Sequence, residues 1–202
     1  SSGIAVLIRA KRRMDELGGH IRAVSIPTQP RRVLDAAGKL VFPGLIDTHT
    51  HFEMNKGLAN ETADDWFTGT RAALAGGTTT VLDFAEPERG CSLASALETW
   101  HGRADGKACC HYGFHMTIKD WDPRIRSELR DMTAAGVTSY KVYLAYDNLR
   151  LSDAAAYQVI QAVGREGGVL GCHCENGDLV NAGIRAQKAA GRLGPSAHPR
   201  SR

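Results

Sequence analysis

The stretch "TTTVLDFA", residues 78–85, shows the pattern that decides the fold. β-Branched and apolar residues dominate it, so it predicts a short buried strand. A helix-like stretch that ends at Gly76 and Gly77 precedes it, and glycine is the usual residue just past a helix end. The same alternation of β-like and helix-like stretches extends from residue 40 to near the end of the chain.

Five stretches have the composition of strands: "LVFPGLID" (40–47), "TTTVLDFA" (78–85), "KACCHYGFHM" (107–116), "TSYKVYLAY" (138–146) and "GVLGCHCE" (168–175). The helices between them are expected to start near Thr62, Ser92, Pro123 and Ser152 and to end at Gly76, Gly106, Gly136 and Gly167, with a fifth that ends at Gly191. Strand–helix units about 30 residues apart predict an α/β fold with a parallel sheet. In a parallel barrel the active residues gather at the C-terminal ends of the strands.

The units divide the chain into two expected parts. Residues 40–202 are predicted to form the first five β/α units of a TIM-type barrel. A complete eight-fold barrel takes about 250 residues, so we expect a truncated one. Residues 1–39 are expected to form a separate part. Residues 21–40 contain short β-like pieces interrupted by two prolines, which predict a small sheet beside the barrel, and residues 1–20 carry little signal.

Composition excludes several classes of function. The 202 residues carry a formal net charge of +3 with the basic residues scattered, which does not indicate a nucleic-acid partner. The chain has no apolar run of about 18 residues, so no membrane span is expected. Its first apolar run precedes basic residues, the wrong order for a secretory signal. Five cysteines, an odd number, favour a reducing compartment and therefore the cytoplasm.

His49 and His51, in "DTHTHF" (47–52), form the first candidate metal site. Residues i and i+2 of a strand share a face, so both imidazoles can reach one ion while Thr50 points away. Zinc binds neutral imidazole, and Asp47 is placed to orient a ligand. Alone, the H-x-H pair is also compatible with two polar residues in a loop.

Lys141 interrupts the otherwise apolar stretch "TSYKVYLAY". One interpretation is a lysine at a strand edge whose amine reaches water. The other is a buried amine with a lowered pKa that reacts with CO₂ to give a carbamate, an anion able to bridge two metal ions.

Two further strand ends carry polar residues. His173 lies in "GCHCENGD" between Cys172 and Cys174, and alternation predicts that an inward-facing histidine directs both cysteines towards the helices instead of a shared zinc ion. Tyr146 follows Lys141 at the expected strand end, where its hydroxyl either stabilises an oxyanion or simply meets solvent. His115 ends the third predicted strand and is expected to border the site.

Taken together, "PGLIDTHTHF", "ALAGGTTTVLDFA", "SYKVYLAY" and "CHCENGD" resemble the dihydropyrimidinases and hydantoinases of the cyclic amidohydrolase superfamily, in order and in spacing. The resemblance covers roughly residues 21–202. The combination of H-x-H, a strand lysine and H-x-E-N-G-D is specific, although no single motif is.

The resemblance implies a mechanism and a set of ligands. His49 and His51 would bind one metal, Lys141 would be the carbamylated bridge, and His173 would bind the second metal. Two zinc ions, or another divalent metal, would hold a bridging hydroxide that attacks a ring amide carbon, and Tyr146 would stabilise the tetrahedral intermediate. Ring opening would give an N-carbamoyl amino acid. The family also implies a β-sandwich beside the barrel, which we assign to residues 1–39, and a homotetramer of the full-length protein.

The family leaves alternatives open. Dihydroorotases carry an arginine where this chain has Glu53, so an uncharged small ring such as dihydrouracil or a hydantoin is favoured, with allantoin as an alternative substrate. Relatives that act as neuronal scaffolds have lost metal ligands, whereas this chain keeps His49, His51, Lys141 and His173. A further histidine ligand and a catalytic aspartate lie on later strands of the family. A non-catalytic fragment or interaction module is therefore the second hypothesis.

Overall fold

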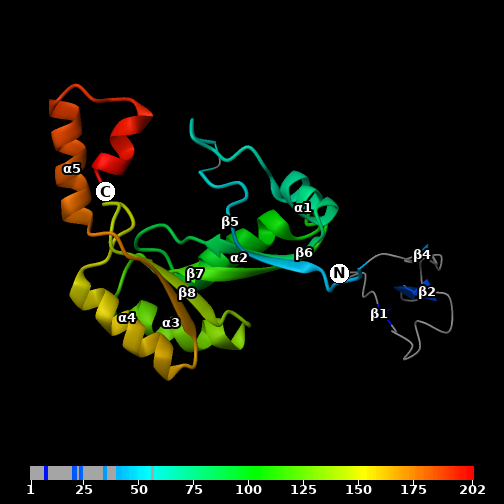
Figure 1. The fold of residues 1–202 in the computed structure, drawn as a ribbon. Coiled ribbons are helices and arrows are strands. Elements are labelled where there is room, and N and C mark those ends of the chain that lie inside the picture. The colour runs from blue at the N-terminus through cyan, green and yellow to red at the C-terminus, as the bar shows by residue number, and fades with distance from the viewer. Residues whose placement is uncertain (1–6, 9–19, 22, 25–33, 36–39, 56) are drawn as a thin grey trace.

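The computed structural model describes residues 7–8, 20–21, 23–24, 34–35, 40–55 and 57–202. From residue 40 onward, five strands alternate with five helices (Figure 1). The strands are β5 (Leu45–Thr50), β6 (Thr78–Ala85), β7 (His111–Thr117), β8 (Ser139–Tyr143) and β9 (Val169–His173). The helices are α1 (Trp66–Ala75), α2 (Leu93–Ala104), α3 (Pro123–Ala134), α4 (Asp153–Arg165) and α5 (Gly177–Ala189), and the 3₁₀ helix η1 (Pro195–Arg200) follows them.

The five strands form one parallel sheet in chain order, β5-β6-β7-β8-β9. A (β/α) barrel is wound in one direction in this way, whereas the strand order of a doubly wound sheet reverses at a switch point. The predicted α/β fold is therefore confirmed as a half-barrel of five β/α units.

The helices begin close to the predicted residues, with one correction. Ser92 and Ser152 cap α2 and α4, and Pro123 opens α3 directly after its cap, as expected. The prediction that α1 starts near Thr62 was wrong. Its cap is Asp65, whose carboxylate accepts from the Thr68 N–H at 2.7 Å while Thr68 Oγ1 accepts from the Asp65 N–H at 3.1 Å. This reciprocal box satisfies two groups that a helix start leaves unpaired, and Thr62 lacks it.

Two strands begin later than predicted. β5 starts at Leu45 instead of residue 40, and Pro43, which has no N–H for a ladder, lies just before it. β7 starts at His111 instead of residue 107 because Lys107 and Ala108 continue the turn after α2, where both N–H groups donate to Ala104 O.

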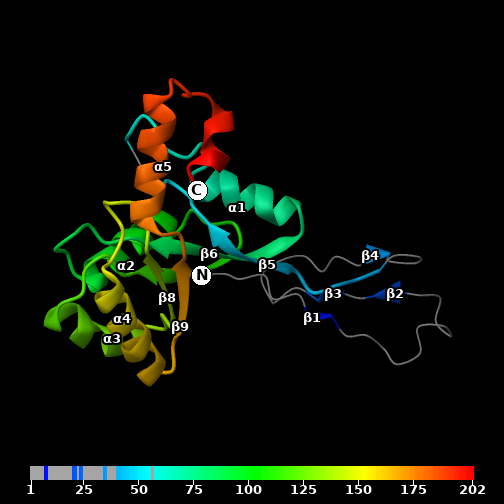
Figure 2. The ribbon, with the colours of Figure 1, turned by 60° about the vertical axis from the view of Figure 1, so that its left-hand side comes forward.

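The core lies between one face of the sheet and the helices. Val81, Met116 and Val142 contribute from β6, β7 and β8, and Trp66 and Val159 contribute from α1 and α4. All five side chains are fully buried. α5 contacts η1, and both views show this pair standing away from α3 and α4 (Figures 1 and 2). The opposite face of the sheet carries the polar residues considered next.

The described residues before position 40 form two antiparallel strand pairs. β1 (Leu7–Ile8) pairs with β3 (Ala23–Val24), and β2 (His20–Ile21) pairs with β4 (Leu34–Asp35). Most of the predicted β-sandwich segment, residues 1–39, lies outside the described residues, so that segment stays a prediction.

Candidate metal centre

Alternation along the strands directs the candidate residues to the sheet face away from the core. Tyr140 and Val142 of β8 enter the core, so Lys141 and Tyr143 face the other way. His173 of β9 lies on the same face, because it is the register partner of Tyr143 in the neighbouring strand. The predicted residues from separate strands are thus brought to one surface.

The two histidines of the H-x-H pair share a face, as predicted. Their ring centroids lie 5.1 Å apart, and each ring packs on Phe84, at 4.7 Å for His49 and 4.9 Å for His51. Thr50 points away, since its hydroxyl donates to Leu82 O at 3.1 Å and lies 3.1 Å from the Asp83 carboxylate. Asp47 was expected to orient a ligand ring, but its carboxylate accepts from the backbone N–H of His49 at 3.1 Å.

Burial lowers the pKa of both imidazoles. For His49, the largest cause is desolvation, followed by the charges of His51 and Lys141. For His51, desolvation is again the largest cause, and Glu86 opposes it. A neutral imidazole has a free lone pair at neutral pH, so this environment favours cation binding over protonation.

Lys141 joins the two ends of the candidate site. Its Nζ lies 6.0 Å from the centre of the Phe84 ring and 5.2 Å from that of Tyr143. His173 stacks on the other side of this arrangement, with its ring 5.7 Å from Tyr143. Phe84 and Tyr143 therefore form an aromatic floor that connects His49 and His51 with Lys141 and His173.

His173 has a side-chain partner of its own. Its Nε2 lies 2.5 Å from a carboxylate oxygen of Glu175, which lowers the pKa of that carboxyl. The cysteines beside it behave differently from each other. Cys172 packs against the core as predicted, whereas Cys174 is exposed and donates to Cys172 O, so only one of the two is an apolar packing group.

Tyr146 is placed by a turn and not by a strand. β8 ends at Tyr143, which corrects the predicted strand end, and Tyr146 adopts a φ of +67°. Its ring lies 5.0 Å from His173, and 39% of the residue is exposed. Tyr146 thus lies beside His173, on a turn instead of at the strand end that was expected.

His115 borders the site, as predicted. Its ring lies 5.0 Å from Phe84, Nδ1 lies 2.6 Å from Ser139 Oγ, and Nε2 lies 2.9 Å from Thr48 O. Within the described part of the chain, no three His, Cys, Asp or Glu side chains are close enough together to hold a metal.

Sequence reasoning missed the side chains that support this face. Asp83 is 2% exposed and accepts from the Phe52 N–H at 2.8 Å and the Phe84 N–H at 2.7 Å. Lys119 and Glu86 form a largely buried ion pair at 3.2 Å. An aspartate inside the apolar stretch "VLDFA" is the signal that could have identified Asp83.

The chain is similar in sequence and in fold to known proteins. The sequence profile of the amidohydrolase family matches residues 40–137. The chain is thus similar to the amidohydrolase family over nearly half of its length. The dihydropyrimidinase of Rattus norvegicus is 42% identical over 169 residues, which cover 83% of this chain and 32% of that protein.

Two other known proteins are also similar to this chain. Dihydropyrimidinase-related protein 5 of Homo sapiens is 40% identical over 167 residues, covering 81% of this chain and 29% of that protein. The solved structure of D-hydantoinase from Bacillus sp. AR9 superposes with a TM-score of 0.83 at 35% identity, covering 100% of this chain and 44% of that one. This chain therefore spans about a third of its curated relatives. Among the described residues no helix is long and apolar enough to cross a membrane.

Proposed function

We propose that this chain supplies the metal-binding residues of a cyclic amidohydrolase that opens a 5,6-dihydropyrimidine or hydantoin ring to an N-carbamoyl amino acid. The observation that carries the proposal is the position of His49, His51 and Lys141 against one ring, Phe84. The similarity to dihydropyrimidinases and D-hydantoinases supports the reaction class.

The donor chemistry fits a pair of divalent ions, with zinc as the first expectation. His49 and His51 offer neutral imidazoles, His173 offers a further ring nitrogen, and a carbamate on Lys141 would add two oxygens. One orphan group supports this fit. Thr117, the register partner of Lys141, is fully buried, and its hydroxyl has no hydrogen-bond partner among the described residues. A carbamate beside it would provide an acceptor.

The side chains divide the work in the proposed reaction. His49, His51, His173 and carbamylated Lys141 would hold the two ions. A bound divalent ion lowers the pKa of a coordinated water and so makes a nucleophile available at neutral pH. Tyr146 would donate its hydroxyl proton in a hydrogen bond to the oxygen of the attacked carbonyl.

The proposal also covers the domains, the location and the oligomeric state of the protein. We assign residues 40–202 to an amidohydrolase barrel and residues 1–39 to a β-sandwich segment, in a cytoplasmic homotetramer of the full-length protein. Size-exclusion chromatography with light scattering tests the assembly.

Metal content is the first test. The purified chain, expressed with zinc and bicarbonate, should contain about two ions per chain and should hydrolyse dihydrouracil or hydantoin. Lys141→Arg keeps the charge but cannot form a carbamate, so it should lose metal. Lys119→Arg is the matched control, because Lys119 is also a poorly exposed lysine of the β7–β8 region but is paired with Glu86.

The alternative is a non-catalytic interaction module. The 40% identity to dihydropyrimidinase-related protein 5, close to that of the dihydropyrimidinase, is the observation that favours it. Folded protein with metal content near zero in the wild type, and with no difference between Lys141→Arg and Lys119→Arg, would contradict the hydrolase proposal and support the module.

A further inference from the structure

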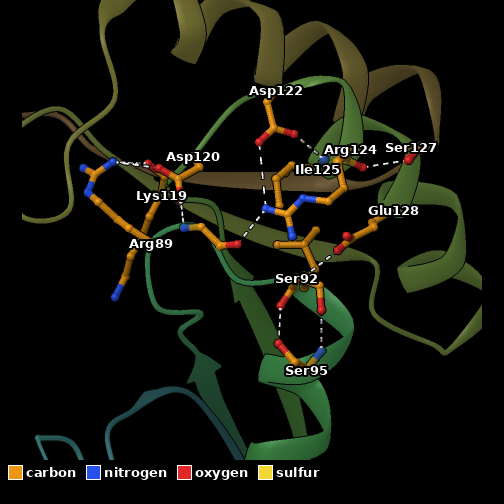
Figure 3. Close-up of polar contacts among 12 residues, drawn as sticks. Arg89, Ser92, Ser95, Lys119, Asp120, Asp122, Arg124, Ile125, Ser127 and Glu128 are labelled. Carbon is orange, nitrogen blue, oxygen red and sulfur yellow. Dashed lines mark hydrogen bonds and ion pairs between the residues drawn. The ribbon is translucent and has the colours of Figure 1, made fainter.

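Arg89, in the loop between β6 and α2, connects three loops at one end of the sheet. Its Nη1 donates to Lys119 O at 2.8 Å and to Asp120 Oδ1 at 2.9 Å (Figure 3). On the other side, Nε donates to Asn148 O at 3.2 Å and Nη2 donates to Arg150 O at 3.1 Å. The guanidinium thus bonds the loop after β7 and the loop after β8 at the same time.

The second of these loops contains Tyr146 in an unfavourable backbone conformation. Residues other than glycine rarely adopt a positive φ, and Tyr146 has a φ of +67°. Its carbonyl accepts from the N–H groups of Leu149 and Arg150, both at 2.8 Å, which closes a tight turn. Such a conformation persists only where the surroundings hold it.

We propose that Arg89 is a positioning residue for Tyr146. By holding the carbonyls of Asn148 and Arg150, it keeps the turn closed and the Tyr146 ring beside His173. The assignment of a catalytic purpose to this position rests on the proposed function of Tyr146.

The chemistry of the side chain explains why an arginine is suited to this position. Three nitrogens of one planar group donate in different directions, to two loops and one carboxylate. A lysine ammonium is a single point on a flexible stem and cannot reach all of these acceptors together. Arg89→Lys should therefore keep the ion pair with Asp120 but release the turn.

Hydrogen exchange tests the positioning directly. Arg89→Gln should accelerate exchange of the Leu149 and Arg150 amides about tenfold, because the turn opens locally more often. Arg124→Gln is the matched control. Its side chain is 44% exposed against 45% for Arg89, and it donates to Gly90 O in the same region without contacting the Tyr146 turn (Figure 3).

Wild-type exchange rates in Arg89→Gln would overturn the proposal, as would equal acceleration in Arg124→Gln. Arg89→Lys serves as the second variant if circular dichroism shows that Arg89→Gln does not fold, and it is judged by the same two criteria.

Kinetics add a measurement that a purely structural residue would not change selectively. In the metal-loaded chain, Arg89→Gln should lower kcat on the order of tenfold with little change in KM, because only the transition state uses the Tyr146 hydroxyl. In a Tyr146→Phe background the same change should have almost no further effect. Independent, multiplying effects would overturn the proposal. If the wild type hydrolyses no cyclic amide, the proposed function fails, and hydrogen exchange alone still decides the role of Arg89.

Discussion

The residues next to His49 and His51, at one end of the sheet, are held by a buried carboxylate, whereas the loop after β8 and the start of α5, at the other end, are joined by ion pairs on the surface. Asp83 accepts two backbone N–H groups, from Phe52 and Phe84, and is almost completely buried. At the β9 end, Arg150 joins Asp147 at 3.1 Å and Asp178 at 2.8 Å, and both carboxylates are largely exposed. The same sheet therefore uses a burial-dependent anchor at one end and a solvent-screened one at the other.

The largest expected effect is at the buried anchor. Asp83→Ala leaves the Phe52 and Phe84 N–H groups without this acceptor and removes one of the two acceptors of the Thr50 hydroxyl, so we expect a loss of about 3 kcal/mol in the free energy of unfolding. Urea denaturation measures it. Asp153→Ala, an exposed acidic residue in the first turn of α4, is the control and should change stability by less than about 0.5 kcal/mol. Equal losses of unfolding free energy in the two variants would mean that the Asp83 carboxylate does not anchor the β5 end of the sheet.

The second largest expected change in stability comes from the packing of Phe52 next to the H-x-H pair. A Cβ at Gly69 would lie 2.2 Å from the ring of Phe52, the residue after His51. Gly69→Ala should therefore destabilise the protein by about 1–3 kcal/mol despite the better helix propensity of alanine. Gly102→Ala, on α2 with open space around its Cβ, should stabilise by about 0.5–1 kcal/mol. Thermal melting temperatures of the two variants compare the effect of alanine on α1 with its effect on α2. An unchanged melting temperature for Gly69→Ala would mean that the Phe52 ring can move aside.

Acid should lower the stability that the β5 end of the sheet, with His49 and His51, contributes to the folded protein. The pKa of His51 is lowered in the folded protein, chiefly by burial, so the unfolded chain binds a proton more readily. The stability that neutral His51 contributes is complete above pH of about 6.5 and is lost as pH falls through the folded pKa. In metal-free protein, His51→Gln should flatten the decline in stability below that pH. A stability curve for His51→Gln that stays parallel to that of the wild type would contradict this prediction.

A high salt concentration should weaken only the ion pairs of Arg150 at the β9 end of the sheet, and this effect is the smallest. Arg150→Gln should lower the urea midpoint slightly at low ionic strength and have no effect in about 1 M NaCl, where the screening length is about 3 Å. The effect of Asp83→Ala should persist in the same salt, since water and ions do not reach that carboxylate. A salt-resistant effect of Arg150→Gln would mean that this end is also anchored by burial.

Local signals predicted much of the fold. Ser92, Ser152 and Pro123 marked helix starts because capping depends on adjacent residues, and alternation placed His49 and His51 on one face. The α1 start was missed because Thr62 and Asp65 both resemble a cap, and only the Thr68 hydroxyl distinguishes them.

Contacts between distant residues were not predictable from a single sequence. Arg89 reaches Asn148 and Arg150 across about 60 residues of chain, and no spacing rule connects them. The positive φ of Tyr146 was also missed, because a tyrosine at the end of an apolar run resembles a strand residue. Asp83 did have a signal, since an aspartate in an apolar strand requires partners.

The ring of Phe84 makes a spectroscopic reporter possible at this site. It lies within 6.0 Å of His49, His51, His115 and the Lys141 amine, so a single fluorine label on that ring would experience changes at all four. Its ¹⁹F resonance would shift when zinc enters, when bicarbonate modifies the lysine, and when acid protonates the imidazoles. Because these events require different additions, one labelled side chain could follow the assembly of the site step by step in solution.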